Sequence, residues 1–174
     1  MRVDSIQDVD DAVDAWWEQW RGHPVLDRVF FAATNAGEFS VLWHGLGVAR
    51  AASGRWDWRT AVRFSAAIGL ESLVVNQGVK RLFGRVRPST AADNESALHL
   101  RQPITSSFPS GHASAAFCAA TLLAPTSRLP FAVRGLAAIV ATSRIHVRLH
   151  HASDVAGGAV TGALLGRAFR RFVA

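Results

Sequence analysis

This chain of 174 residues has a single cysteine and few long apolar runs. It also has few clusters of basic residues and no basic segment at its N-terminus. The single cysteine, Cys118, lies in an alanine-rich apolar stretch, which excludes a disulfide framework and a cysteine metal site. The excess of 19 basic over 13 acidic residues is scattered along the chain, which argues against nucleic-acid binding. The first twenty residues are rich in aspartate, so no cleavable signal peptide is expected there.

Apolar residues, in contrast, are abundant. They make up 49% of the chain against 18% charged residues, which is more than a soluble domain of this length normally buries. Six apolar segments are expected, at about 25–36, 39–52, 60–82, 112–124, 130–147 and 154–169. Several are shorter than the roughly 20 apolar residues of a membrane span, so hydropathy alone does not decide the class.

The segment from Ile6 to Trp20 places apolar residues and three tryptophans at helical spacing, with acids mostly on the opposite face. This pattern predicts an amphipathic helix anchored at a membrane interface, with a packing helix of a soluble bundle as the alternative. The prediction is therefore an all-α fold. Residues 1–22 form an interfacial segment, and residues 23–174 form a polytopic membrane bundle of about six helices.

The positions of the arginines favour membrane crossing. Arginines lie between the second and third segments, beside the connection at 125–129, and at the C-terminus. If six segments cross, these arginines and both termini share the cytoplasmic side. Three motif fragments, at residues 80–88, 109–112 and 143–154, then lie together on the extracytoplasmic side of the cell membrane. The polar connection from Ser89 to Phe108 lies on that same side and is expected to cover them.

The first fragment is Lys80, Arg87 and Pro88. The two cations are seven residues apart, either two helical turns or one turn plus a loop, and Pro88 stops a helix. Arginine offers a planar fork to phosphate oxygens and lysine a mobile charge. Arg81 and Arg85 are interpreted instead as solvated charges at a helix end or membrane edge.

The second fragment, Pro109-Ser110-Gly111-His112, opens the fourth apolar segment. Ser110 can cap that helix, Gly111 permits a close approach to the main chain, and the helix N-terminus favours an anion. His112 then lies beside a phosphate dianion, where it is suited to protonate a leaving oxygen.

The third fragment runs from Ser143 and Arg144 to His150 and Asp154. A spacing of four residues lets His150 and Asp154 face each other across one turn. The carboxylate then fixes the imidazole tautomer and leaves the other ring nitrogen as a nucleophile or base. The spacing alone does not decide which of His112 and His150 attacks.

Three further residues are candidates for a supporting role. Asn76 is four residues before Lys80 and is expected to orient it. Glu71 lies in an apolar segment, where we expect it to pair with an arginine of another helix or to make a polar helix contact. His151 is expected to touch the substrate, whereas His146 is interpreted as a rim or structural residue. No carboxylate-rich cluster accompanies the histidines, so no metal site is predicted.

Together the three fragments resemble the signature of the type 2 phosphatidic acid phosphatase superfamily, Lys-x6-Arg-Pro, Pro-Ser-Gly-His and Ser-Arg-x5-His-x3-Asp. All three parts match in order without substitution. The resemblance implies a six-helix core and hydrolysis without a cofactor through a phosphohistidine. It also implies His150 as nucleophile, Asp154 as its orienting residue and His112 as acid. Lys80, Arg87, Ser110, Gly111 and Arg144 would hold the phosphate oxygens.

The sequence therefore predicts an integral membrane phosphatase for a lipid-linked phosphate monoester or diphosphate. Candidate substrates are phosphatidic acid, phosphatidylglycerol phosphate, a polyprenyl diphosphate or a polyprenyl-linked sugar phosphate. The alternatives are a transport or binding protein for phosphorylated lipids, and a soluble acid phosphatase or haloperoxidase-like relative. The first would have no need of the His150–Asp154 pair, and relatives of the haloperoxidase kind are much larger.

Overall fold

The computed structural model describes residues 5–88 and 105–174, and these residues form an all-helical fold. The helices are α1 Ile6–Trp17, α2 Pro24–Gly37, α3 Val41–Ala52, α4 Trp58–Leu73, α5 Gly111–Leu123, α6 Pro130–His146 and α7 Ala152–Val173. The six segments predicted from the sequence correspond to α2–α7, and α1 is the predicted N-terminal helix. The connection expected to cover the site lies outside the described residues, except for 105–108.

Local sequence explains most of the helix ends. Ser5, Asp57 and Ser110 cap α1, α4 and α5, because each side chain accepts a hydrogen bond from a backbone N–H in the first turn. Proline begins α2 and α6, where its missing N–H has no partner to lose. The predicted boundaries therefore agree with the observed ones to within a few residues.

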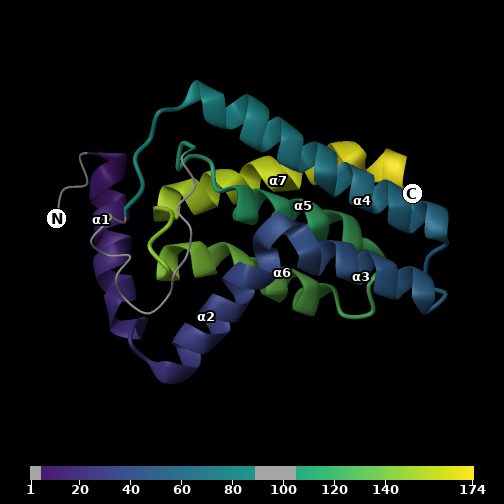
Figure 1. Cartoon of the computed structure of the whole chain (residues 1–174), viewed down its shortest axis with the longest axis horizontal. Helices are drawn as coiled ribbons and strands as arrows, with labels where there is room; N and C mark the ends of the chain where they lie inside the picture. The colour runs from purple at the N-terminus through teal and green to yellow at the C-terminus, as the bar shows by residue number, and fades with distance from the viewer. Residues whose placement is uncertain (1–4, 89–104) are drawn as a thin grey trace.

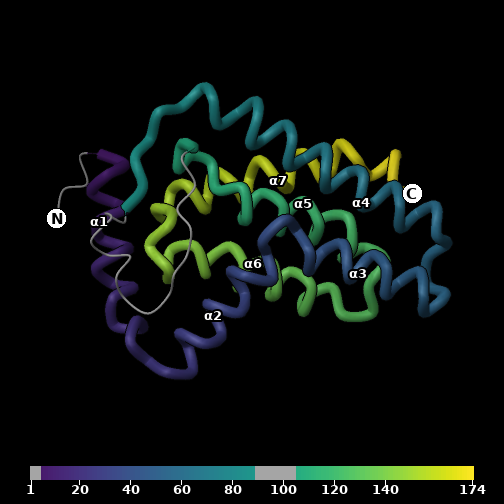
Figure 2. Tube along the Cα trace, in the orientation of Figure 1, coloured from purple at the N-terminus to yellow at the C-terminus, as the bar shows by residue number. Residues whose placement is uncertain are grey.

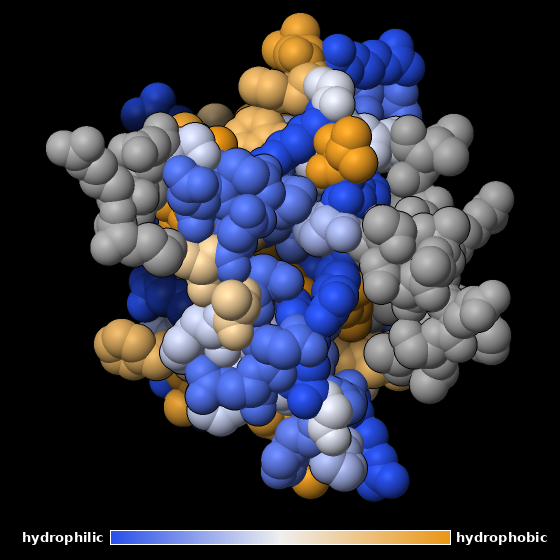
Figure 3. All heavy atoms as spheres, turned by 90° about the vertical axis from the view of Figure 1, so that its left-hand side faces the viewer, coloured by the Kyte–Doolittle hydropathy of each residue, from blue (hydrophilic) through white to orange (hydrophobic). Residues whose placement is uncertain are grey.

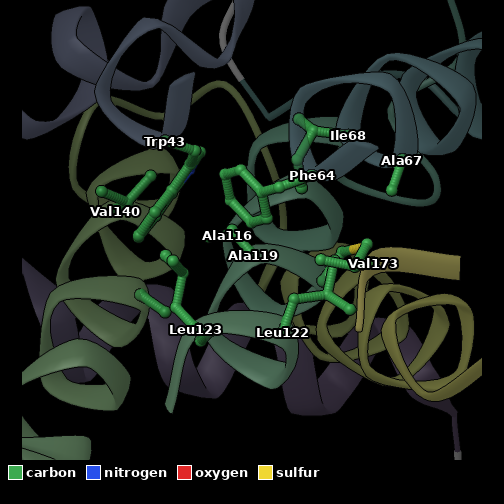
Figure 4. Packing of buried hydrophobic residues seen from close by; sticks show 13 residues of the cluster. Trp43, Phe64, Ala67, Ile68, Ala116, Ala119, Leu122, Leu123, Val140 and Val173 are labelled. Carbon is green, nitrogen blue, oxygen red and sulfur yellow. The ribbon is translucent and has the colours of Figure 1, made fainter. Parts of the chain in front are cut away.

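The helices α4, α6 and α7 pack around α5, α3 packs against α4, and α1 crosses one end of this bundle (Figure 1; Figure 2). Apolar side chains from all five bundle helices meet in one core (Figure 4). Its fully buried members include Trp43, Phe64, Ile68, Leu123 and Val140. The remaining core residues include the alanines Ala116, Ala119 and Ala120 of α5, whose small side chains let neighbouring helices approach closely.

The contact between α5 and α7 is made by glycines spaced four residues apart. A Cβ atom on Gly158, Gly162 or Gly166 would lie 2.4, 1.9 or 2.9 Å from a backbone carbonyl oxygen of α5 or of its cap, at Ser110, Ser114 and Cys118 in turn. The glycines of α7 and the carbonyls of α5 that they face follow each other in the same order along the chain, so α5 and α7 run parallel. Their N-termini therefore lie side by side at the end of the bundle where α1 crosses.

Seen from the α1 end, the surface of the described residues is mostly hydrophilic (Figure 3). Within residues 5–88 and 105–174, no helix is both long enough and apolar enough to cross a membrane. The six predicted crossings stay a prediction.

The glycine contact yields a stability prediction. The Gly162→Ala variant should lose about 1–3 kcal/mol of unfolding free energy, because its Cβ would collide with the Ser114 carbonyl and force α5 and α7 apart. The matched control is Gly135→Ala in α6, where the added methyl meets open space. That variant should gain about 0.5–1 kcal/mol from the lower backbone entropy of alanine. Equal melting temperatures for the two variants would contradict the packing argument.

Candidate active site

The three predicted fragments meet at one cavity of about 260 Å³ beside the N-terminus of α5. The predicted site residues that line it are Lys80, Arg87, Gly111, His112, Arg144, His150 and Asn76. Ser110 and Asp154 are fully buried directly behind this wall, and the backbone N–H of Ser110 donates to the Asp154 carbonyl over 3.0 Å. The second and third fragments, which are far apart in the sequence, are thus neighbours.

Lys80 reaches the cavity because α4 changes its winding before it ends. A wider π turn at Val74–Gly78 and a 3₁₀ turn at Val79–Leu82 follow the regular helix. Such turns shift the direction of the following side chains, and they are frequent at functional sites. The chain then becomes extended from Phe83 onward, so the Lys80–Arg87 spacing is one turn plus a loop.

Arg87 and Arg144 both donate to neutral groups, and a Glu38 carboxylate oxygen also lies 3.9 Å from the Nη1 atom of Arg144. The Nη1 atom of Arg87 donates to the Leu149 carbonyl over 2.7 Å and lies 3.1 Å from Nε2 of His150. The Nη1 atom of Arg144 donates to the Thr34 hydroxyl over 2.6 Å, and this guanidinium is only 2% exposed. Burial lowers the pKa of Arg87 below its usual range, yet an arginine remains a cation at any physiological pH.

His150 follows a sharp reversal of the chain after α6. Arg148 adopts a left-handed φ of 54°, and the N–H groups of Leu149 and His150 both donate to the Arg144 carbonyl over 3.1 Å. This turn leaves His150 buried between Arg87 and Asp154. Burial, reinforced by Arg144, Arg87 and Lys80, lowers the pKa of His150 to about 3, although the Asp154 carboxylate opposes the shift. The resting imidazole is therefore neutral.

The tautomer of His150 follows from its two neighbours. A guanidinium can only donate, so Nε2 of His150 must present its lone pair to Arg87. The ring proton is then on Nδ1, which lies 3.6 Å from Oδ2 of Asp154. That distance is beyond a hydrogen bond, but it brings the carboxylate into position to stabilise a positively charged ring.

Asp154 is fixed from two sides. Its Oδ2 accepts the backbone N–H of His151 over 2.9 Å, which caps the first turn of α7, and its Oδ1 accepts Nη1 of Arg85 over 2.7 Å. The prediction that Arg85 is a solvated helix-end charge is therefore wrong. The helical turns after α4 end at Leu82, as the predicted segment did, but the following residues bring Arg85 to the buried carboxylates of Asp10 and Asp154.

His112 lies in the first turn of α5 against the end of α2. Its Nε2 is 3.2 Å from the Thr34 carbonyl, 3.6 Å from a Glu38 carboxylate oxygen and 3.4 Å from Nη1 of Arg144. A Cβ atom on Gly37 would lie 2.6 Å from the His112 ring, so glycine is needed there for the ring to fit. The N-terminal helices thus form one wall of the site.

Two of the supporting residues have partners other than those predicted. Glu71 accepts a short hydrogen bond from Ser114 of α5, so the expected arginine partner is wrong and the polar helix contact is confirmed. Asn76 donates to Ser72 over 3.0 Å instead of orienting Lys80, and its amide oxygen lies 3.0 Å from where a Cβ on Gly111 would be. Asn76 thus lines the cavity beside the α5 N-terminus.

The two other histidines of this region occupy different positions. His151 is the N-cap residue of α7, next to the cavity residue His150. His146 has a structural place, as predicted: it accepts from the Trp17 indole over 3.1 Å, stacks on Phe30 and contacts Asp27. Within the described residues, no three His, Cys, Asp or Glu side chains gather as a metal site requires.

Four neighbours of the site were not found from the sequence. Thr34 and Glu38 lie at the end of α2, and Asp10 and Arg85 lie behind Asp154. Thr34 and Glu38 carry no distinctive spacing. Asp10 is one of several acids in its helix, and only the packing of that helix distinguishes it from the exposed ones.

Comparisons with known proteins agree with this geometry. A model of the PAP2 superfamily matches residues 60–174. A decaprenylphosphoryl-5-phosphoribose phosphatase of Mycobacterium tuberculosis is 40% identical over 88 residues, which are 51% of this chain and 48% of that protein. The chain thus matches about half the length of that relative. The protein with the same name from Mycolicibacterium smegmatis is 35% identical over 130 residues, 73% of this chain and 68% of that one.

A solved structure has the same fold. The transmembrane PAP2-type phosphatidylglycerolphosphate phosphatase of Bacillus subtilis superposes with a TM-score of 0.76 at 25% identity, over 98% of this chain and 87% of that one. The superfamily match covers more than half of the chain, and the complete three-part motif surrounds a single cavity. The chain is therefore a member of the PAP2 superfamily.

Proposed function

We propose that this chain is a phosphatase that cleaves a lipid-linked phosphate monoester or diphosphate through a phosphohistidine on His150, without a metal ion. The contact between His150 and Arg87 carries the proposal. Because Arg87 can only donate, the lone pair of His150 is on Nε2, 3.1 Å from Arg87, and both residues line the same cavity as Lys80 and Arg144. A neutral nucleophile beside three cations is suited to attack a phosphate.

In the first step, Nε2 of His150 attacks phosphorus and the bond from phosphorus to the leaving oxygen breaks. Burial and the nearby Arg144 lower the pKa of His112 well below its usual value, so the ring must gain its proton when the dianion binds. It then gives that proton to the leaving oxygen, and the product leaves as an alcohol or as phosphate. The ring of His150 becomes positively charged as the phosphorus–nitrogen bond forms. Asp154, 3.6 Å from Nδ1, stabilises this charge.

In the second step, water attacks the phosphohistidine and the phosphorus–nitrogen bond breaks. His112, now neutral, takes the proton of the water, and His150 returns to its neutral form with the proton on Nδ1. Two easier transfers thus replace one slow hydrolysis. Lys80, Arg87, Arg144 and the N–H groups at the α5 N-terminus stabilise the charge on the equatorial oxygens in both steps.

A location in the membrane, with the site on the extracytoplasmic side, completes the proposal. The B. subtilis neighbour is described as transmembrane, and the M. tuberculosis relative as a phosphatase for a decaprenylphosphoryl compound. In this chain Arg50, Arg55 and Arg128 line a second hollow, and no motif residue is among the residues that line it. Arginines in connections away from the motif residues are what the positive-inside rule expects on the cytoplasmic side.

A panel of phosphorylated lipids tests the activity and the nucleophile together. Detergent-solubilised protein should release phosphate from phosphatidic acid, phosphatidylglycerol phosphate, a polyprenyl diphosphate or a polyprenyl-linked sugar phosphate, and EDTA should leave the rate unchanged. The His150→Ala variant should lose at least about 10³-fold in kcat, because the covalent route is closed. His23→Ala, at an exposed histidine, is the control. Full activity of the His150→Ala variant would refute the mechanism.

The role of His112 is separable by the choice of leaving group. Replacing His112 with Asn should reduce hydrolysis of an alkyl phosphate about 10²- to 10⁴-fold, the usual contribution of a general acid. Hydrolysis of p-nitrophenyl phosphate should fall less than about tenfold, because nitrophenolate leaves without a proton. His44→Asn in α3 is the matched control. Equal losses on the two substrates would show that His112 only binds phosphate.

The neutral state of His150 predicts how stability depends on pH. The pKa of this group falls from 6.5 in an exposed ring to about 3 in the folded protein, so the unfolded chain binds the extra proton in that window. The contribution is complete above pH 6.5 and is lost as pH falls toward about 3, by up to about 1.4 kcal/mol per pH unit. Melting temperatures at pH 7 and 4.5 should differ less for His150→Asn than for the parent. The same difference in both would mean that His150 is not neutral when folded.

A further inference from the structure

Asp10 of α1 lies directly behind the site and is the most deeply buried acid of its helix. Its side chain is fully buried, whereas Asp8, Asp11 and Asp14 are partly or fully exposed. It accepts the backbone N–H of Ser153 over 2.8 Å and the Ser153 hydroxyl over 2.6 Å. It also forms an ion pair with Arg85. Every partner of this carboxylate thus belongs to the start of α7 or to the first motif fragment.

Arg85 connects Asp10 to Asp154. One terminal nitrogen of its guanidinium donates to Asp10, and the other donates to Oδ1 of Asp154 over 2.7 Å and to the Ser153 hydroxyl over 2.6 Å. Asp154 in turn faces Nδ1 of His150. A continuous series of charged contacts therefore leads from α1 to the imidazole that lines the cavity.

The charges in this series affect how strongly the Asp154 carboxylate can interact with His150. An arginine paired with a single carboxylate draws that carboxylate toward itself and makes it a weaker partner for a histidine. Since Arg85 is shared between two carboxylates, its pull on Asp154 is balanced by Asp10. Burial would raise the pKa of Asp10, but the hydrogen bonds from Ser153 and Arg85 outweigh it and hold that pKa below its usual value. The carboxylate is therefore charged at neutral pH.

We propose that Asp10 is a positioning residue of the active site, which holds Arg85 against Asp154 and thereby supports His150 as a nucleophile. The proposal rests on the proposed function for the identity of the nucleophile. It makes α1 a part of the active site, although residue 10 lies outside the segment that the superfamily model matches.

Binding of two anions separates positioning from simple loss of structure. Orthovanadate takes the geometry of the phosphoryl transition state and bonds to the attacking nitrogen, whereas inorganic phosphate is held by the cations alone. In the Asp10→Asn variant, which keeps the shape and loses the charge, the Kd for orthovanadate should rise about tenfold. The Kd for phosphate should change less than about twofold, because Lys80, Arg87 and Arg144 are untouched. Asp10→Ala should show a larger effect in the same direction.

Two controls have different purposes. Asp11→Asn removes an exposed charge one residue away and should change neither Kd. Trp17→Phe removes the indole hydrogen bond to His146, so it loosens α1 on α6 while leaving Asp10 in place. If Trp17→Phe weakens orthovanadate binding as much as Asp10→Asn, docking of α1 explains the effect and the proposal is wrong. Equal weakening of both anions in Asp10→Asn would also overturn it.

A double-mutant cycle in the lipid assay completes the test. If Asp10 acts through Asp154, Asp10→Asn should lower kcat about 10- to 100-fold in the parent and less than about threefold in an Asp154→Asn background. Additive losses would overturn the proposal. If the parent releases no phosphate from any lipid, the proposed function fails. The difference between orthovanadate and phosphate binding then still decides the role of Asp10.

Discussion

The parallel contact between α5 and α7 determines where the other parts of the site lie. Glycines at positions 158, 162 and 166 let α7 approach the carbonyls of α5 so closely that no side chain fits between them. The two N-termini are therefore level, and the N–H of Ser110 bonds the Asp154 carbonyl. The second and third fragments of the motif meet because of this contact, and α6 returns antiparallel to deliver Arg144 to the same end.

The charges of the site are arranged in two layers. The inner layer, toward the cavity, holds Lys80, Arg87 and Arg144 around a neutral His150. The outer layer holds Asp10, Arg85 and Asp154, in which one cation serves two carboxylates. A phosphate dianion would add negative charge to the inner layer, where the two arginines also donate to the Thr34 hydroxyl and the Leu149 carbonyl. The outer layer has one carboxylate more than it has cations, and its member Asp154 faces Nδ1 of His150, where negative charge stabilises a positively charged ring.

The sequence predicted the helices and the motif contacts well, because both depend on local or repeated patterns. Proline at Pro24 and Pro130, a cap at Ser110 and apolar periodicity were sufficient to locate the helices. The residues that were missed are single side chains whose partners are set by tertiary packing. Thr34 is one hydroxyl in an apolar helix, and only the fold shows that it bonds Arg144. Arg85 was misjudged because a charge near a helix end looks the same in sequence whether it points outward or inward.

The acidic face of α1 is explained by the same packing. Asp10, Asp14 and Glu18 are spaced four residues apart, so they form one stripe along the helix. Each is paired with an arginine: Asp10 with Arg85, Asp14 with Arg21, and Glu18 with both Arg21 and Arg148. Arg21 also donates to the carbonyls of Ile145 and His146, at the end of α6. An acidic stripe, unexpected beside anionic lipid, therefore matches the basic end of the bundle. Trp16 and Trp20 remain exposed on the surface of this helix, so the interfacial location predicted for it stays a prediction.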